Sequence, residues 1–287
     1  MISLLTQLNN ILQHLCRSTN KLFFMKVPYT LLLAGIILSS CSPGKMVVSE
    51  ELKTNKDEYP VKGRNGTRIK QKVTFGEFVT NSVKRSWTRG NSSRSGIGYY
   101  ETNRMEWVNI ISTEYINKKQ TIRFELSDGA KLSEVYCVSK FNAKDLEIGR
   151  NPNSILNIGM DILGIGGKSS SNYYVQIFTG ENDERPWEMV IDNQLSQARP
   201  KEYIGYLAKS RNEYYSIVPI TKLEQNGKSG NILAGSIGFE FRDSQGKAVA
   251  AVSLINNGMV FLGKTSKEER FLLANACTAL LLQDVIE

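Results

Sequence analysis

The sequence predicts a mainly β protein, in which an antiparallel barrel or strongly curved sheets enclose a hydrophobic C-terminal helix. Two observations lead to this fold class. Turn signals such as Asn226-Gly227 and Asn257-Gly258 recur about every eight to twelve residues, a spacing typical of antiparallel sandwiches and barrels. The last long segment, a predicted helix over residues 266–286, has hydrophobic residues on every side between Phe271 and Leu282, so this part must be surrounded by other elements.

The clearest strand pair is a hairpin around Asp128-Gly129. Residues 120–126 (QTIRFEL) and 132–138 (LSEVYCV) are rich in β-branched and aromatic side chains, and Ser-Asp-Gly between them is a turn signature. Residues 69–79 (IKQKVTFGEFV) alternate apolar and polar side chains, which predicts one further strand. More strands are expected at residues 105–111, 173–178, 187–191, 203–207, 214–218, 236–242, 248–254 and 259–262.

The C-terminal helix has its own start signal. Ser266 and Glu269 have the spacing of a capping box. In the segment FLLANACTALLL that follows, Asn275 and Thr278 are the only polar residues. The run is roughly a dozen residues, whereas a membrane span needs about 20, so we expect a helix enclosed by strands.

Residues 238–252, GFEFRDSQGKAVAAV, together with this helix, resemble the tubby C-terminal fold that phospholipid scramblases and LURP-one-related proteins share. The resemblance is one of pattern and covers only the C-terminal part of the chain. It implies a barrel threaded by a hydrophobic helix. Tubby-type domains bind phosphoinositide headgroups through basic residues, and those positions cannot be aligned with this sequence.

Residues 25–41, MKVPYTLLLAGIILSSC, have the order of a secretory signal: a charged start, a short apolar run and small residues. Cys41 directly follows Leu-Ser-Ser, which resembles the lipobox of bacterial lipoproteins. In those proteins the cysteine takes a thioether-linked diacylglycerol and becomes the first residue of the mature chain. The resemblance implies that Cys41 is a lipid anchor. The alternative is an ordinary cleaved signal with an incidental cysteine.

The signal also predicts the domain boundaries. Residues 1–24 precede a complete signal, so we interpret them as a misassigned start or a long n-region. Residues 25–40 are the signal peptide, and the polar residues 41–59 are expected to form a flexible tether. Residues 60–287 form a single β-rich domain. Ser42, where the enterobacterial sorting rule places an aspartate for inner-membrane retention, favours the outer membrane within a bacterial cell envelope.

The mature chain contains no histidine, because His14, the only one, precedes the signal. Histidine is the commonest general base and metal ligand at neutral pH, so Ser-His and Cys-His nucleophiles and zincin-type sites are excluded. We expect no metal and no cofactor. Besides Cys41, Cys137 and Cys277 remain, and their apolar neighbours predict buried thiols, although one disulfide is possible.

Part of the net charge of +8 is concentrated between Lys62 and Arg94, where nine basic side chains accompany one acid. Within this segment, Lys84, Arg85 and Arg89 flank Trp87. A basic patch with an aromatic residue can bind an anionic lipid headgroup, an acidic envelope glycan or nucleic acid, and export makes nucleic acid the weakest of these. The alternative is a set of solvated strand faces.

Three acids, Glu181, Asp183 and Glu184, cluster in the sequence. Paired carboxyls can serve glycoside hydrolysis, but acids this close between strands are typical of a solvated turn. We therefore expect a non-catalytic envelope protein, held at the membrane by lipidated Cys41, that binds a protein, lipid or glycan or has a structural role. A histidine-free glycan hydrolase is the alternative.

Overall fold

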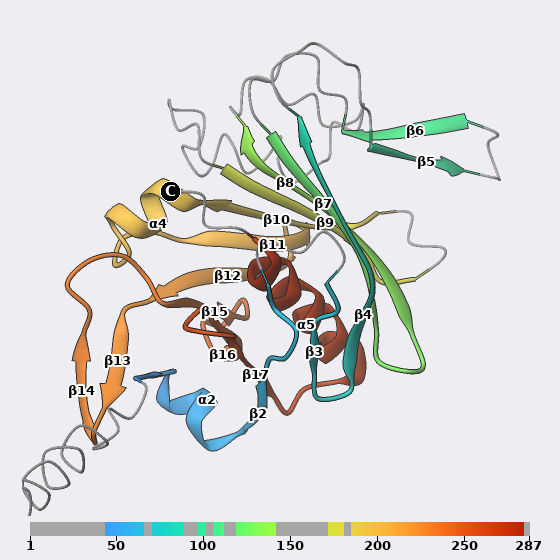
Figure 1. The fold of residues 1–287 in the computed structure, drawn as a ribbon. Coiled ribbons are helices and arrows are strands. Elements are labelled where there is room, and N and C mark those ends of the chain that lie inside the picture. Colours follow the sequence, from blue (N-terminus) through green and yellow to red (C-terminus); the bar gives the residue numbers. More distant parts are fainter. Residues whose placement is uncertain are drawn as a thin grey trace, which may run out of the picture. The chain divides into compact units, whose positions relative to one another are not determined.

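Twelve strands form one antiparallel sheet that curves around the C-terminal helix (Figure 1). The computed structural model describes residues 44–65, 71–88, 97–101, 106–111, 119–141, 172–180 and 185–283. The fold class expected from the sequence is confirmed. The strands follow one another across the sheet in the order β2 (Lys56–Pro60), β17 (Met259–Gly263), β16 (Ala248–Ser253), β15 (Gly238–Arg242), β12 (Glu213–Ile220), β11 (Gly205–Ser210), β10 (Trp187–Asp192), β9 (Asn172–Phe178), β8 (Leu132–Phe141), β7 (Lys119–Ser127), β4 (Phe78–Thr88) and β3 (Thr74–Phe75).

The two outer strands, β2 and β3, come together and nearly close the sheet into a barrel. Lys62, just after β2, pairs with Thr74 of β3 as an antiparallel bridge. The Lys62 amide donates to the Thr74 carbonyl at 2.9 Å, and the Thr74 amide donates to the Lys62 carbonyl at 3.0 Å. Pairing at this point covers backbone groups that two open sheet edges would otherwise expose.

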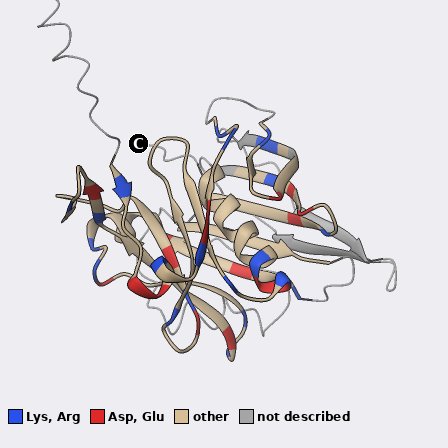
Figure 2. Ribbon diagram, turned by 90° about the horizontal axis from the view of Figure 1, so that it is seen from below, with Lys and Arg blue, Asp and Glu red and all other residues tan. Residues whose placement is uncertain are grey.

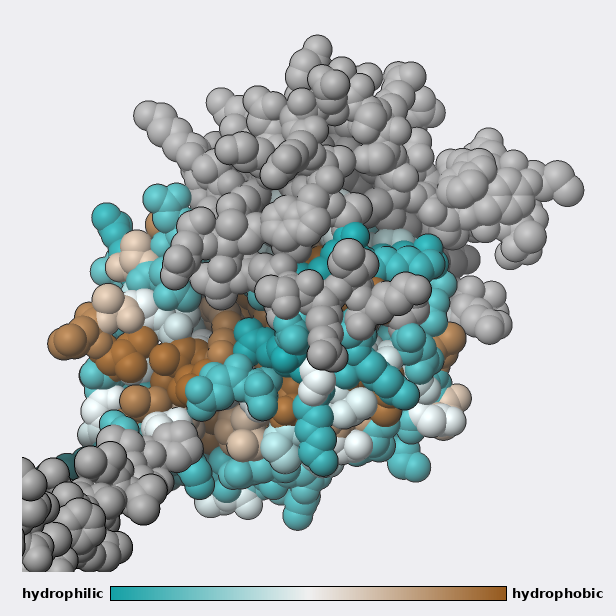
Figure 3. Space-filling model, in the orientation of Figure 1, coloured by the Kyte–Doolittle hydropathy of each residue, from teal (hydrophilic) through white to brown (hydrophobic). Residues whose placement is uncertain are grey.

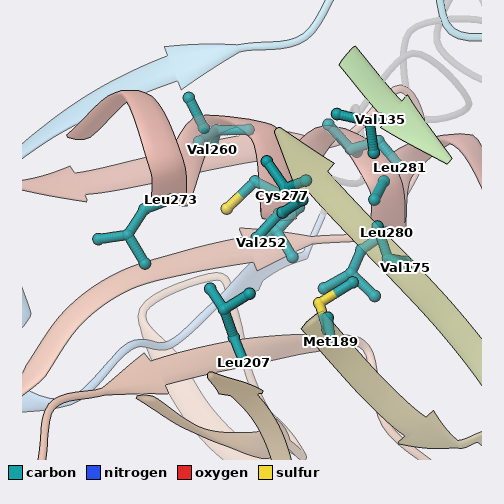
Figure 4. Close-up of a cluster of buried hydrophobic side chains, with 14 of the residues drawn as sticks. Val135, Val175, Met189, Leu207, Val252, Val260, Leu273, Cys277, Leu280 and Leu281 are labelled. Atoms are coloured by element: carbon teal, nitrogen blue, oxygen red, sulfur yellow. The ribbon is translucent and has the colours of Figure 1, made fainter. Parts of the chain in front are cut away.

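The helix α5 (Lys267–Leu282) is enclosed, as its all-round apolar surface predicts. All twelve side chains from Phe271 to Leu282 are buried. Figure 4 shows Leu273, Cys277 and Leu280 packed among side chains from the surrounding strands. The interior of the curved sheet is therefore filled by the protein's own helix.

Both polar residues of the enclosed stretch are hydrogen-bonded, as burial of polar atoms requires. Asn275 Oδ1 accepts from Ser133 Oγ of β8 at 2.5 Å, and Asn275 Nδ2 donates to the Phe271 carbonyl at 2.8 Å. Thr278 Oγ1 donates to the Ala274 carbonyl at 2.7 Å. These bonds allow two polar side chains inside an apolar core.

The predicted cap is present at the start of α5. Ser266 Oγ accepts from the Glu269 amide at 3.1 Å, which satisfies one of the free donors at a helix N-terminus. The Glu269 carboxylate accepts from the Tyr215 hydroxyl of β12 at 3.1 Å. The helix ends at Leu282, before the predicted residue 286, and residues 284–287 lie outside the described part.

Residues 45–60 are folded, which corrects the expected tether. β1 (Lys45–Met46), α2 (Glu50–Thr54) and β2 lie within this segment. β2 pairs with β17, more than 190 residues away, in a register from Pro60↔Met259 to Lys56↔Gly263. A small second core forms from apolar residues, with Met46, Val48 and Leu52 on this segment and Ile220, Ala248, Ala251 and Phe261 on the main sheet.

A buried carboxylate also holds this segment. Glu240 of β15, only 2% exposed, accepts from the Ser49 amide at 2.9 Å, directly before α2. Glu240 also pairs with Arg242, with 2.9 Å between Oε1 and Nη2. The tether prediction counted apolar residues in the segment itself, whereas the stabilising contacts are with distant strands.

The single strand expected at residues 69–79 is interrupted by a turn between two strands, and residues 69 and 70 lie outside the described part. β3 ends at Phe75, β4 begins at Phe78, and Gly76 between them has a positive φ of 54°. A Cβ at Gly76 would lie 2.6 Å from the Tyr59 ring, so both conformation and space favour glycine. By contrast, the β7–β8 hairpin around Asp128-Gly129 forms as predicted.

The remaining described elements complete the fold. β13 (Lys222–Gln225) and β14 (Lys228–Asn231) join β1 in a three-stranded sheet in the order β1-β13-β14. β5 (Ile97–Glu101) pairs with β6 (Glu106–Ile111), and the short helix α4 (Asn193–Ala198) follows β10.

Candidate functional site

Two arginines bind the carbonyl end of α5. Arg85 Nη2 donates to the Leu282 carbonyl at 2.9 Å, and Arg64 Nε donates to the Leu281 carbonyl at 2.9 Å. The last carbonyls of a helix have no partner within the helix and carry the negative end of its dipole. Both guanidinium groups therefore stabilise the enclosed helix where its backbone is most polar.

This geometry separates two members of the predicted basic patch. Lys84 and Arg85 are neighbours on β4, so their side chains point to opposite faces of the strand. Lys84 is exposed, whereas Arg85 is half-buried and bonded to α5. The Trp87 side chain and Arg89 lie outside the described part. Across the described residues, positive and negative side chains are interspersed (Figure 2).

Lys84 and Arg85 thus do not share a surface. Arg85 faces inward because the end of α5 supplies a partner, a contact that the local sequence does not reveal. A role of Lys84, Trp87 and Arg89 in binding an anionic ligand stays a prediction.

The other predicted site residues lie outside the described residues. They are the proposed lipidation site Cys41 and the three clustered acids Glu181, Asp183 and Glu184. The hypothesis of a carboxylate-based glycan hydrolase therefore stays untested.

Cys137 and Cys277 are both free and buried, so they are not joined in a disulfide. Burial raises the pKa of the Cys137 thiol to about 12 and raises that of Cys277 further above its ordinary value. A thiol kept protonated is a poor nucleophile and a poor metal ligand. The expectation of small buried side chains is confirmed.

One polar cluster of the structure was not predicted from the sequence. Tyr136, Gln176 and Glu188 stand in one row across β8, β9 and β10, on the face opposite the enclosed helix. Glu188 Oε1 accepts from the Tyr174 hydroxyl at 2.8 Å. Burial first, and then the Glu188 carboxylate, raise the Tyr174 pKa well above its ordinary value.

This cluster is closed rather than open to a ligand. Glu188 is 8% exposed and Tyr174 is fully buried. The hydroxyl supplies the hydrogen bond that a buried carboxylate requires, which assigns the pair a structural role. The register of strands β8, β9 and β10 brings these residues together from separate parts of the sequence, so no local motif predicts the cluster.

Among the described residues, no group of three or more His, Cys, Asp and Glu side chains is placed to hold a metal ion. No helix in the described ranges is both long and apolar enough to cross a membrane.

Comparison of the chain with protein-family models, with curated proteins and with solved structures gives no match. The resemblances to bacterial lipoproteins and to tubby-type domains therefore stay predictions from the sequence.

Proposed function

We propose that this is a lipid-anchored protein of the bacterial cell envelope, attached through Cys41 and non-catalytic. It holds a binding or structural domain at the membrane surface, with the outer membrane favoured. The observation that supports this proposal most directly is the order of features in residues 25–41: a charged residue, a short apolar run, Leu-Ser-Ser and then Cys41. Two or more acyl chains on the cysteine hold a protein at a bilayer, where a single chain exchanges.

The start of the folded unit supports this anchoring. β1 begins at Lys45, four residues after Cys41. No strand or helix that the structure describes lies within residues 1–40. A modified Cys41 would then be the first residue of a chain that enters its fold almost at once.

The enclosed helix supports a binding or structural role carried by the outer surface. Side chains of α5 fill the interior of the main sheet. In some eight-stranded barrels, the interior holds a small ligand instead of side chains. A ligand or partner of this protein would therefore meet the outer faces of the strands or the loops. An anionic lipid, an envelope glycan or a protein would fit such a surface.

Metabolic labelling with an alkyne fatty acid in a bacterial host tests the anchor. We expect label on the wild-type chain, loss of label in Cys41→Ser, and unchanged label in the matched control Cys16→Ser, because Cys16 lies in the removed segment. Intact mass should show a chain that begins at Cys41. An unlabelled wild-type chain with residues 25–40 still attached would overturn the proposal.

A further inference from the structure

The small sheet β1-β13-β14 lies where the chain enters the fold. Lys45 pairs with Glu224 of β13, and Lys222 of β13 pairs with Asn231 of β14. β1 and β14 are the two edges of this sheet, about 10 Å apart at the usual strand spacing. Lys45 pairs with Glu224, and Glu224 pairs with Ser229, so the chain enters at the β13–β14 turn end of the small sheet, whereas the loop that follows β14 leaves from the other end.

That loop carries the most exposed large apolar side chain of the described part of the chain. Leu233 is 106% exposed, compared with 51% for Leu132, 47% for Ile204 and 42% for Leu195. Ala234 beside it is exposed, and Ile232 is half-buried. Figure 3 shows apolar residues gathered beside β13 and β14 on the face that it presents.

The loop is held in place by hydrogen bonds at both ends. The Ile232 amide donates to the Thr221 carbonyl at 2.8 Å, and the Ile237 amide donates to the Ile220 carbonyl at 2.9 Å. Leu233 is therefore presented on a fixed backbone that leaves its side chain in solvent.

A side-chain amide fastens the same loop to α4. Gln197 Oε1 accepts from the Ser236 amide at 2.9 Å, and Gln197 Nε2 donates to Ser236 Oγ at 2.8 Å. A leucine held away from the core in this way costs hydration free energy unless something apolar covers it.

The charges of the small sheet suit an anionic surface. Its three strands carry three lysines, Lys45, Lys222 and Lys228, and one acid, Glu224, all of them exposed. Lys45, Lys222 and Glu224 share one face, because Lys45 is paired with Glu224 and Lys222 is two positions along β13. The excess of positive charge favours contact with anionic headgroups.

Chain length limits how far this surface can be from a lipid on Cys41. Lys45 is four positions after Cys41, with three residues between them. A fully extended chain spans at most about 3.6 Å per residue, so the reach is about 14 Å. A lipid anchor at Cys41 therefore keeps Lys45, on the edge strand β1 of the small sheet, within about 14 Å of the modified cysteine.

We propose that the small sheet and residues 231–237 form the membrane-facing surface of the protein. Leu233 enters the interface between headgroups and acyl chains, and Lys45 and Lys222, which share one face of the sheet, contact anionic headgroups. The occupant of this surface is the bilayer in which the lipid anchor is inserted. The inference rests on the proposed lipidation of Cys41 and adds the orientation of the domain.

The test uses the full lipidated protein, recovered from membranes and reconstituted into vesicles of phosphatidylcholine with phosphatidylglycerol. Leu233→Cys is labelled with an environment-sensitive fluorophore. The matched control is Leu132→Cys, an exposed leucine on the β7–β8 hairpin. Cys137 and Cys277 are buried and should not take up label in the folded protein.

We expect blue-shifted emission, quenching by lipids with brominated acyl chains and loss of quenching by aqueous iodide at position 233, with none of these at position 132. Vesicles of phosphatidylcholine alone should give a smaller blue shift at position 233. Equal iodide quenching at both positions in a vesicle-bound protein would overturn the orientation and leave the anchor standing. Recovery of the protein only in the soluble fraction would overturn the anchor and the orientation together.

Discussion

Replacement of Arg85 by Met distinguishes a structural arginine from a ligand-binding one. The substitution keeps most of the apolar stem and removes the guanidinium group that donates to the Leu282 carbonyl at 2.9 Å. A hydrogen bond that involves a charged group contributes about 1.5–3 kcal/mol, and a cation at a helix C-terminus contributes about 0.3–2 kcal/mol. Because one contact supplies both effects, we expect a loss of about 2–3 kcal/mol in the free energy of unfolding.

The assay is urea unfolding, monitored by circular dichroism, of a chain that begins at residue 41 and carries Cys41→Ser. For a domain of this size the expected loss corresponds to a fall in Tm of about 4–12 °C. Lys84→Met is the matched control, because Lys84 is the next residue on the same strand and is exposed. Its free energy of unfolding should change by no more than about 0.5 kcal/mol.

Wild-type stability in Arg85→Met would refute this reasoning. If Arg85→Met kept its stability and lost binding to anionic vesicles, Arg85 would be a ligand-binding residue and the contact with α5 would be incidental. Loss of binding in Lys84→Met alone would assign ligand binding to the outer face of β4.

Two further predictions concern the core around the enclosed helix. Ser133→Ala and Asn275→Ala should each lower the free energy of unfolding by about 1–3 kcal/mol. The double variant should lose about 1 kcal/mol less than the sum of the two, because both substitutions remove the same hydrogen bond. Strict additivity in a double-mutant cycle measured by urea unfolding would contradict this. Alkaline pH should destabilise the fold, because burial raises the Cys137 pKa from about 9 to about 12. Above pH 9 the thiol of the unfolded chain loses its proton, whereas the buried Cys137 thiol of the folded chain keeps it. The contribution of the protonated thiol to the free energy of unfolding is therefore complete below pH 9 and is lost as the pH rises towards 12. Urea midpoints that stay constant from pH 8 to 11 would disprove it, as would rapid modification of the native thiol at pH 8.

Local chemistry made some elements predictable. An enclosed helix follows from α5 alone, because ten of the twelve residues from Phe271 to Leu282 are apolar and lie on every side of the helix, which leaves no face for water. Asp128-Gly129 predicts the β7–β8 hairpin, and Ser266 predicts the start of α5, because each signal lies within a few residues of the structure that it specifies.

Contacts between distant segments decided the rest. Residues 45–60 were expected to form a tether because they contain few apolar residues. In the structure, strand β2 pairs with β17, and the Ser49 amide donates a hydrogen bond to the Glu240 carboxylate. The closed pair of Tyr174 and Glu188 likewise depends on strand register. Such contacts leave no signal in a short window of sequence.

The sequence by itself determined the fold class, the enclosure of the last helix and the candidate anchor at Cys41, since each depends on hydrophobicity and spacing along a continuous stretch. Tertiary structure alone decided that Arg85 turns inward, that the chain is folded from Lys45 onward and that Leu233 stands exposed on the loop after β14. The physical reason is that a side chain's partner depends on which distant strand or helix end lies opposite it.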